Sequence, residues 1–170
     1  GFRILKGIEV DILKNGELDY PDQILREFDL VLASIHQGFT KNVTERMGKA
    51  MENPYVDIIG HPTGRLISKR EGCVIDLSKV MEMAAATGTW LECNAYPDRL
   101  DLNDVNLKKA KEMGIKISIG TDAHGVADLR WFRFGLETCR RAWLEAKDVV
   151  NTYPIDKLLA QRKSRTRPGP

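Results

Sequence analysis

Apolar residues along this chain gather in short runs that alternate with segments of helical periodicity. Five runs rich in valine and isoleucine are short enough for strands, at residues 2–13, 30–36, 56–59, 90–95 and 115–120. The segments between them repeat apolar residues every three or four positions, which predicts helices at residues 21–28, 40–51, 77–86 and 102–113. Alternating strands and helices predict an α/β fold, in which parallel strands carry outer helices.

The last third of the chain has a different pattern, because helical periodicity continues there without an intervening strand. We expect helices at residues 126–141, 145–150 and 154–162. The final residues, 163–170, are polar and basic, and we expect them to form a flexible tail. The sequence therefore predicts one domain over residues 1–162, followed by this basic tail.

Composition agrees with a single globular domain. The chain has 170 residues, of which 42% are hydrophobic and 29% are charged. The formal charge of +2 neither requires nor excludes a nucleic-acid partner. No apolar run approaches the roughly 18 residues that span a bilayer, so we expect no membrane partner. Three widely spaced cysteines favour reduced thiols and a cytoplasmic location over a disulfide framework.

The candidate chemistry lies at the carboxyl ends of the expected strands. All three histidines of the chain, His36, His61 and His124, lie at or just past such an end, as does Asp122, and Glu9 lies within the first strand. Successive polar positions, with Asn94 included, are about 25 to 33 residues apart, close to the roughly 31 residues of one strand-helix unit in a barrel. Because loops converge at this edge of a parallel sheet, we expect these side chains to share one pocket.

These residue types favour a site for divalent metal ions. Imidazoles and carboxylates are the usual ligands of Zn²⁺, Mn²⁺ and Fe²⁺, and a carboxylate such as Glu9 can bridge two ions. Two ions about 4 Å apart can hold the attacking and leaving oxygens of a phosphoester. A single histidine at a strand end is more often structural, but three of three histidines at equivalent edges favour the metal site. We interpret Asn94 as a residue that organises the loop beside it.

Two arginines are candidates for binding substrate phosphate. Arg65 ends a short loop that begins at His61, and Arg99 follows the fourth expected strand. The planar guanidinium group matches phosphate oxygens in geometry and charge. The alternative for each arginine is a structural ion pair.

Six segments of the chain resemble the phosphoesterase domain of family X DNA polymerases, a branch of the polymerase and histidinol phosphatase (PHP) family. They are residues 7–10 (GIEV), 33–36 (ASIH), 53–65 (NPYVDIIGHPTGR), 91–95 (LECNA), 99–104 (RLDLND) and 121–124 (TDAH). The combination of NPYVD with HPTGR is specific to the polymerase-linked branch. The similarity extends from residue 1 to about residue 162.

The resemblance implies a distorted TIM-like barrel of seven strand-helix units that holds up to three metal ions, Mn²⁺ or Zn²⁺ with Fe²⁺ as a further candidate. By position, Glu9 resembles the carboxylate that bridges two ions. His36 and His61 resemble ligands of one ion in that pair, Asp122 resembles a ligand of the other, and His124 resembles a ligand of the third. Glu9, Asp122 and His124 would then be the catalytic residues.

The resemblance also implies an activity. Related domains serve base-excision repair as Mn²⁺-dependent 3′–5′ exonucleases, abasic-site endonucleases or 3′-phosphatases, so the expected partner is DNA, at 3′ ends and abasic sites, through a full-length polymerase. A small-molecule phosphatase of the histidinol-phosphatase type is one alternative. A non-catalytic domain that stabilises or positions a polymerase is another.

The sequence departs from the family pattern at its start. The family opens with a His-x-His strand and two further histidines before the position of Glu9, and these are absent here. The chain also starts without methionine and enters an apolar segment at once. We therefore expect a carboxy-terminal, five-strand piece of the barrel that lacks the first two units, with weak or no catalysis by itself.

Overall fold

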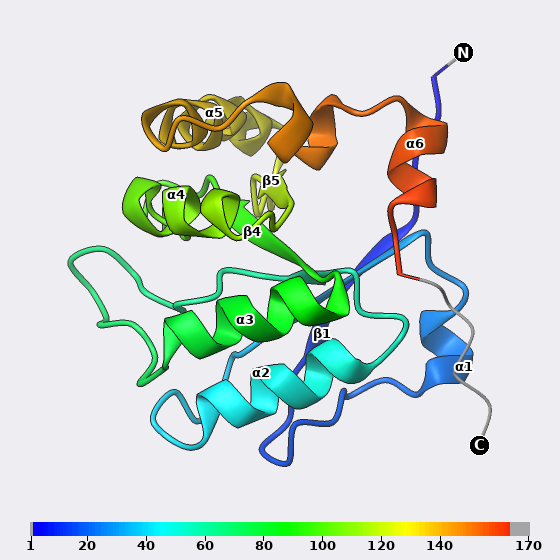
Figure 1. The fold of residues 1–170 in the computed structure, drawn as a ribbon, viewed down its shortest axis with the longest axis vertical. Coiled ribbons are helices and arrows are strands. Elements are labelled where there is room, and N and C mark those ends of the chain that lie inside the picture. The colour runs from blue at the N-terminus through cyan, green and yellow to red at the C-terminus, as the bar shows by residue number, and fades with distance from the viewer. Residues whose placement is uncertain (1, 164–170) are drawn as a thin grey trace.

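The computed structural model describes residues 2–163 and shows a five-stranded sheet flanked by helices (Figure 1). All neighbouring strands are parallel, and their order in the sheet follows the chain. The strands are β1 (Gly7–Asp11), β2 (Leu30–Ser34), β3 (Ile58–Ile59), β4 (Trp90–Asn94) and β5 (Ile117–Gly120). The predicted α/β class is confirmed, and the sheet corresponds to part of a TIM-like barrel. Most of the predicted basic tail, residues 164–170, lies outside the described residues.

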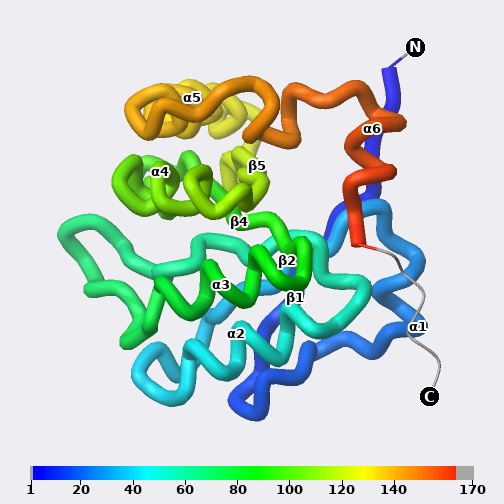
Figure 2. Tube along the Cα trace, viewed as in Figure 1, coloured from blue at the N-terminus to red at the C-terminus, as the bar shows by residue number. Residues whose placement is uncertain are grey.

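Each strand is followed by a helix, as the periodicity predicts. The helices are α1 (Asp22–Leu25), α2 (Val43–Glu52), α3 (Leu77–Thr87), α4 (Asp104–Glu112) and α5 (Phe132–Arg141). A 3₁₀ helix, η1 (Val126–Trp131), leads into α5, and the chain continues through η2 (Ala146–Asp148), η3 (Val150–Thr152) and α6 (Ile155–Ala160). In Figures 1 and 2, α2 packs beside α3.

Local signals explain where the longer helices begin and end. The Asp76 carboxylate accepts the backbone N–H of Lys79 at the start of α3, and Asn103 does the same for Asn106 at the start of α4. Helix α3 ends at Gly88, whose φ of 70° is left-handed and therefore suits glycine. No helix in the described part of the chain combines the length and apolar character needed to cross a membrane.

Two predicted elements differ from the structure. The first strand is shorter than the predicted residues 2–13, because its partner β2 begins only at Leu30, which pairs with Gly7. Phe2 and Ile4 consequently remain outside the sheet and exposed. The helix predicted at residues 145–150 is instead a pair of short 3₁₀ turns, the first closed by reciprocal hydrogen bonds between Glu145 and Asp148.

Alternation along the strands gives the sheet two different faces. One face packs against the helices and forms the main core, in which Val31, Leu91 and Ile117 are fully buried. Cys93 belongs to this face, and all three cysteines are buried free thiols. The cytoplasmic location that the cysteines suggested stays a prediction.

The other face carries both apolar and polar residues. A small cluster around Ile58 and Trp90 packs there against Val150 of η3. Beyond this cluster, toward the carboxyl ends of the strands, the same face carries Glu9 of β1 and Glu92 of β4. The alternation of the strands therefore separates the carboxylates of the candidate site from the apolar core.

Candidate metal centre

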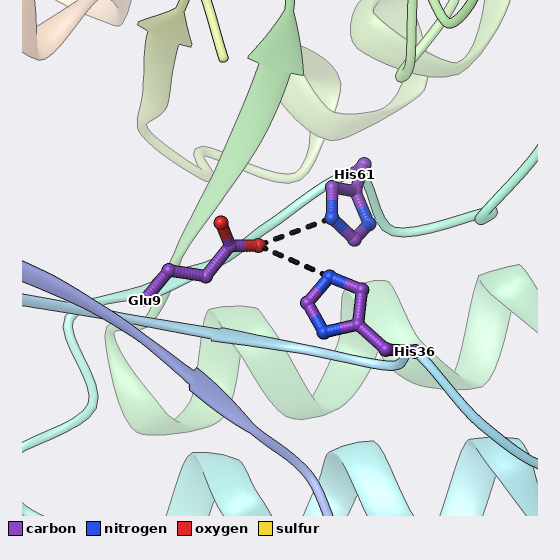
Figure 3. Close-up of side chains that lie close together, drawn as sticks. All are labelled: Glu9, His36 and His61. Carbon is purple, nitrogen blue, oxygen red and sulfur yellow. Dashed lines mark hydrogen bonds and ion pairs between the residues drawn. The ribbon is translucent and has the colours of Figure 1, made fainter. Parts of the chain in front are cut away.

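Three predicted ligands converge at the carboxyl edge of the sheet. Glu9 comes from β1, while His36 and His61 each lie two residues past the ends of β2 and β3. Glu9 Oε1 lies 3.1 Å from His61 Nε2 and 3.5 Å from His36 Nε2, so one carboxylate faces both rings (Figure 3). One potential ligand atom from each residue lies within 4.8 Å of the others. This group could hold a metal ion, since imidazole nitrogens and a carboxylate form an ordinary donor set for a divalent cation.

Charge pairing stabilises the group in its metal-free form. Burial opposes ionisation of Glu9, but hydrogen bonds from His36 and His61 outweigh it and hold the pKa of this carboxyl well below its usual range. The Glu9 hydrogen bond also raises the pKa of His36 to about 9 against the opposing effect of burial, and Asp11 contributes in the same direction. A metal ion must therefore displace a proton from this pair to bind.

Asp11 orients the His36 ring. Its Oδ1 accepts a hydrogen bond from His36 Nδ1 at 2.5 Å, which leaves Nε2 directed toward Glu9. A carboxylate on the far nitrogen of a ligand histidine is a common arrangement in metal sites, where it fixes the ring and increases its basicity. Asp11 was not among the sequence-predicted site residues, although its position two residues after Glu9 on the same strand places both on one face.

Glu92, a residue that sequence reasoning missed, holds the backbone of His61 in place. The side chain of His61 is only 3% exposed, and its backbone has a left-handed φ of 28°. Its backbone N–H donates to Glu92 Oε2 at 2.6 Å. Burial raises the pKa of Glu92 to about 8, although the hydrogen bonds from His61 and Asn94 lower it, and the charges of Glu9 and Asp122 add to the increase. The available signal was a glutamate in the middle of a strand whose residues are all buried.

Asp122 and His124 lie near this group without joining it. Asp122 Oδ2 accepts hydrogen bonds from Asn94 Nδ2 and Arg99 Nε, each at 3.2 Å. His124 is 82% exposed, and its Nδ1 lies 2.8 Å from the backbone oxygen of Asp122. Both residues line the same pocket of about 620 Å³ as Glu9, His36 and His61. The five predicted ligands thus share a pocket, and their roles as ligands stay predictions.

Asn94 organises the loop after β4, as expected. Its Nδ2 donates to Glu92 and to Asp122, and its Oδ1 accepts the backbone N–H of Tyr96 at 2.9 Å. The Asn94 amide therefore connects the carboxylate of Glu92, which holds the His61 backbone, to the carboxylate of Asp122.

The two candidate arginines have different surroundings. Arg65 donates to the backbone oxygens of Arg99 and Leu100, so it ties the loop after β3 to the loop after β4. Arg99 pairs with Asp122, but its buried Nη1 has no hydrogen-bond partner among the described residues. Arg99 also lines the pocket, with 16% of its side chain exposed. Phosphate binding by either arginine stays a prediction.

Asp101 is a second residue that sequence reasoning missed. It is fully buried, and its carboxylate accepts the backbone N–H groups of Thr63 and Gly64 at 3.0 and 2.9 Å. Burial raises the pKa of Asp101, although the hydrogen bond from Thr63 and the charges of His61 and Arg65 lower it. Asp101 and Arg65 together make the two loops of the pocket wall one hydrogen-bonded unit.

Comparison with known proteins agrees with this geometry. The chain is 48% identical over 157 residues to the DNA polymerase/3′-5′ exonuclease PolX of Bacillus subtilis (strain 168), covering 91% of this chain but only 28% of that protein. It is 35% identical over 181 residues to a probable phosphatase of Thermoanaerobacter sp. (strain X514), covering 98% of this chain and 71% of the phosphatase. A probable phosphatase of Caldanaerobacter subterraneus is 31% identical, and the match covers 70% of its length.

No protein-family model matches the sequence, so the assignment depends on these relatives and on the site. The Thermoanaerobacter phosphatase is 35% identical to the chain, and the match covers more than two thirds of the phosphatase. This relative establishes the family, and the match to PolX agrees with the same family. The convergence of Glu9, His36 and His61 agrees with metal-dependent phosphoester chemistry. This chain belongs to the polymerase and histidinol phosphatase family of phosphoesterases.

Proposed function

We propose that the chain is the metal-dependent phosphoesterase domain of a family X DNA polymerase and hydrolyses phosphoesters at DNA 3′ ends or abasic sites. The observation that carries the proposal is the group of Glu9, His36 and His61, whose potential ligand atoms lie within 4.8 Å of one another. The 48% identity to PolX supports DNA as the substrate. Exonuclease, abasic-site endonuclease and 3′-phosphatase activity all fit this substrate, and base-excision repair is the process they would serve.

Glu9, His36 and His61 would hold the first divalent ion, with Mn²⁺ or Zn²⁺ as the leading candidates and Fe²⁺ as another. Asp122 and His124 would contribute to further ions at the same pocket. A bound divalent ion supplies a Lewis acid that polarises a phosphoryl oxygen and acidifies water. The rigid backbone of His61 and the Asp11 contact to His36 keep the ligand nitrogens in place before binding.

The remaining residues of the pocket supply charge and a proton. The guanidinium of Arg99, which lines the pocket, would stabilise the charge that develops on a phosphoryl oxygen. Asp122 holds the Arg99 guanidinium in position through its Nε. His124 is exposed at the pocket, so where it does not hold a further ion it is placed to give a proton to the leaving oxygen.

The test is metal binding and hydrolysis by the chain and its Glu9→Gln variant. We expect the metal-free chain to bind Mn²⁺ in calorimetric titration and to shorten a 3′-recessed duplex when the protein is in excess over DNA. Glu9→Gln should weaken the first binding event and lower the rate at least 100-fold. Glu17→Gln, which changes an exposed glutamate just past the same strand, is the matched control. Equal activity in wild type and Glu9→Gln, or no binding of any divalent ion, would refute the proposal.

A second candidate is a phosphatase for a small molecule of the histidinol phosphate type. Its support is that several of the relatives are described as probable phosphatases. Turnover of free histidinol phosphate and of a 3′-phosphorylated oligonucleotide under the same conditions separates the two candidates. Preference for the oligonucleotide supports DNA as the substrate, whereas preference for histidinol phosphate supports a small-molecule phosphatase. A non-catalytic domain would hydrolyse neither.

A further inference from the structure

The pocket of the metal centre has a chemically distinct second part. Besides the ligand residues it is lined by Leu66, Lys69, Tyr96, Asp98 and Arg99. A phosphate group needs only the cations among these residues. The tyrosine adds an aromatic surface within the same pocket of about 620 Å³, which is much larger than a phosphate group. This second part therefore fits a ligand that joins phosphate to a flat, apolar group.

Tyr96 is held in one orientation before any ligand binds. Its backbone N–H donates to Asn94 Oδ1, the same amide that contacts Glu92 and Asp122. Its ring meets the ring of Trp131 at a centroid distance of 4.7 Å and an angle of 81°, an edge-on contact between aromatic groups. In such a contact one ring keeps a face free, and a fixed ring loses little entropy when a ligand stacks on it.

Cationic groups adjoin the aromatic surface. Arg99, three positions along the chain from Tyr96, lines the same pocket. Lys69, which is exposed, pairs with Asp98 and lines the same pocket as Tyr96. An aromatic ring beside basic side chains is the general arrangement by which proteins bind single-stranded nucleic acid, since bases stack while cations follow the backbone.

We propose that Tyr96 is a stacking platform for the nucleobase next to the scissile phosphoester, held in place by Trp131. The inference rests on the proposed function, because it takes a DNA 3′ end as the ligand, and it adds the residue that distinguishes a nucleotide from a bare phosphate. Stacking one base on an aromatic side chain changes binding by about tenfold or more.

The test is binding of a single-stranded oligodeoxynucleotide with 2-aminopurine at its 3′ terminus and a phosphorothioate last linkage that resists cleavage. Stacking quenches 2-aminopurine fluorescence. We expect wild type and Tyr96→Phe to bind with strong quenching. Tyr96→Ala should raise Kd about tenfold and lose most of the quenching. Tyr96→Leu, which keeps apolar bulk against Trp131, should behave like Tyr96→Ala even if the alanine variant is unstable. Tyr20→Ala, at a partly exposed tyrosine that does not line this pocket, is the matched control.

Competition by inorganic phosphate separates the aromatic role from the cationic one. Phosphate should compete with the same inhibition constant in wild type and Tyr96→Leu, since it does not reach the ring. Wild-type affinity and quenching in Tyr96→Leu, or no binding of the oligonucleotide by wild type, would overturn the inference. Quenching that depends on Tyr96 without hydrolysis of any phosphoester would sustain the inference and contradict the proposed function. Hydrolysis of DNA at the same rate in wild type and Tyr96→Leu would sustain the proposed function and contradict the inference.

Discussion

The buried carboxylate of Glu92 accepts the backbone N–H of His61, with 2.6 Å between Oε2 and N. This bond joins β4 to the loop after β3 and holds a histidine whose φ of 28° lies where side chains with a Cβ are strained. Gly120 on β5 makes room for the carboxylate, because a Cβ there would lie 2.2 Å from Glu92 Oε1. The position of the His61 ring therefore depends on a residue that does not touch it.

Glu92→Ala should weaken the first divalent ion although Glu92 is not a predicted ligand. Without the carboxylate the buried N–H of His61 loses its acceptor, and the ring is free to leave the position facing Glu9. Loss of a group that supports a metal ligand typically lowers affinity about 10- to 100-fold. Glu92→Gln keeps an acceptor, so its affinity for the first ion should lie between those of Glu92→Ala and wild type. Zn²⁺ titration against a chromophoric chelator measures the change, with the exposed Glu82→Ala on α3 as control. An unchanged affinity in Glu92→Ala would contradict this role.

His36 and His124 should differ in their effect on metal binding. His36 belongs to the group whose ligand atoms lie within 4.8 Å, whereas His124 is 82% exposed and lies outside it. His36→Ala should therefore weaken the first ion by about 100-fold or more, because one of three ligands is lost. His124→Ala should leave the first ion unchanged and affect only weaker binding events. Calorimetric titration with Mn²⁺ resolves the successive events. A loss of the tight event in His124→Ala would place that residue in the first site instead.

Asp101→Ala should destabilise the fold through the pocket wall. The carboxylate is fully buried and accepts the N–H groups of Thr63 and Gly64. Without it the Thr63 N–H loses its acceptor, whereas the Gly64 N–H keeps the backbone oxygen of His61 at 2.8 Å. One unsatisfied buried group costs roughly 1–3 kcal/mol, so the free energy of unfolding should fall by about 1–3 kcal/mol. Asp101→Asn keeps one acceptor oxygen and should cost less. Urea unfolding followed by circular dichroism gives the values, with the exposed Asp156→Ala on α6 as control. A change below about 0.5 kcal/mol in Asp101→Ala would show that the loop is held by other contacts.

The sequence was sufficient to predict the strands, the helices that cross between them and the convergence of three candidate ligands. Period-two and period-3.6 patterns are local, and parallel strands necessarily bring their carboxyl ends to one edge, so Glu9, His36 and His61 could be placed together. Short elements were less predictable. Residues 2–5 are apolar enough for a strand, but whether they pair depends on where β2 begins, which the local pattern does not contain.

The contacts of the supporting residues could not be predicted, because they are made to backbone groups that are distant in the chain. Glu92 acts on the N–H of His61, and Asp101 acts on those of Thr63 and Gly64. Backbone donors are the same at every non-proline position, so no residue type marks them. Arg65 is a related case, since its position suggested a phosphate ligand, whereas its guanidinium contacts two carbonyl oxygens.

Lys163 should make stability depend on pH in the alkaline range. Its ammonium group donates to the backbone oxygens of Met51 and Asn53, and burial lowers the pKa of Lys163 to about 8, against the opposing charge of Asp57. The unfolded value is 10.5, so the unfolded chain binds a proton between pH 10.5 and 8 that the folded chain does not. The contribution of this group to stability is therefore greatest above pH 10.5, falls as the pH drops toward 8, and stays low below that.

Lys163→Met removes the titration, so the gain in stability from pH 8 to pH 10 should be smaller than in wild type by about 1 kcal/mol or less, since water screens a partly exposed group. Urea unfolding at both pH values measures this, and the exposed Lys41→Met should keep the wild-type dependence. Identical pH dependence in Lys163→Met and wild type would show that the ammonium is fully hydrated in the folded chain.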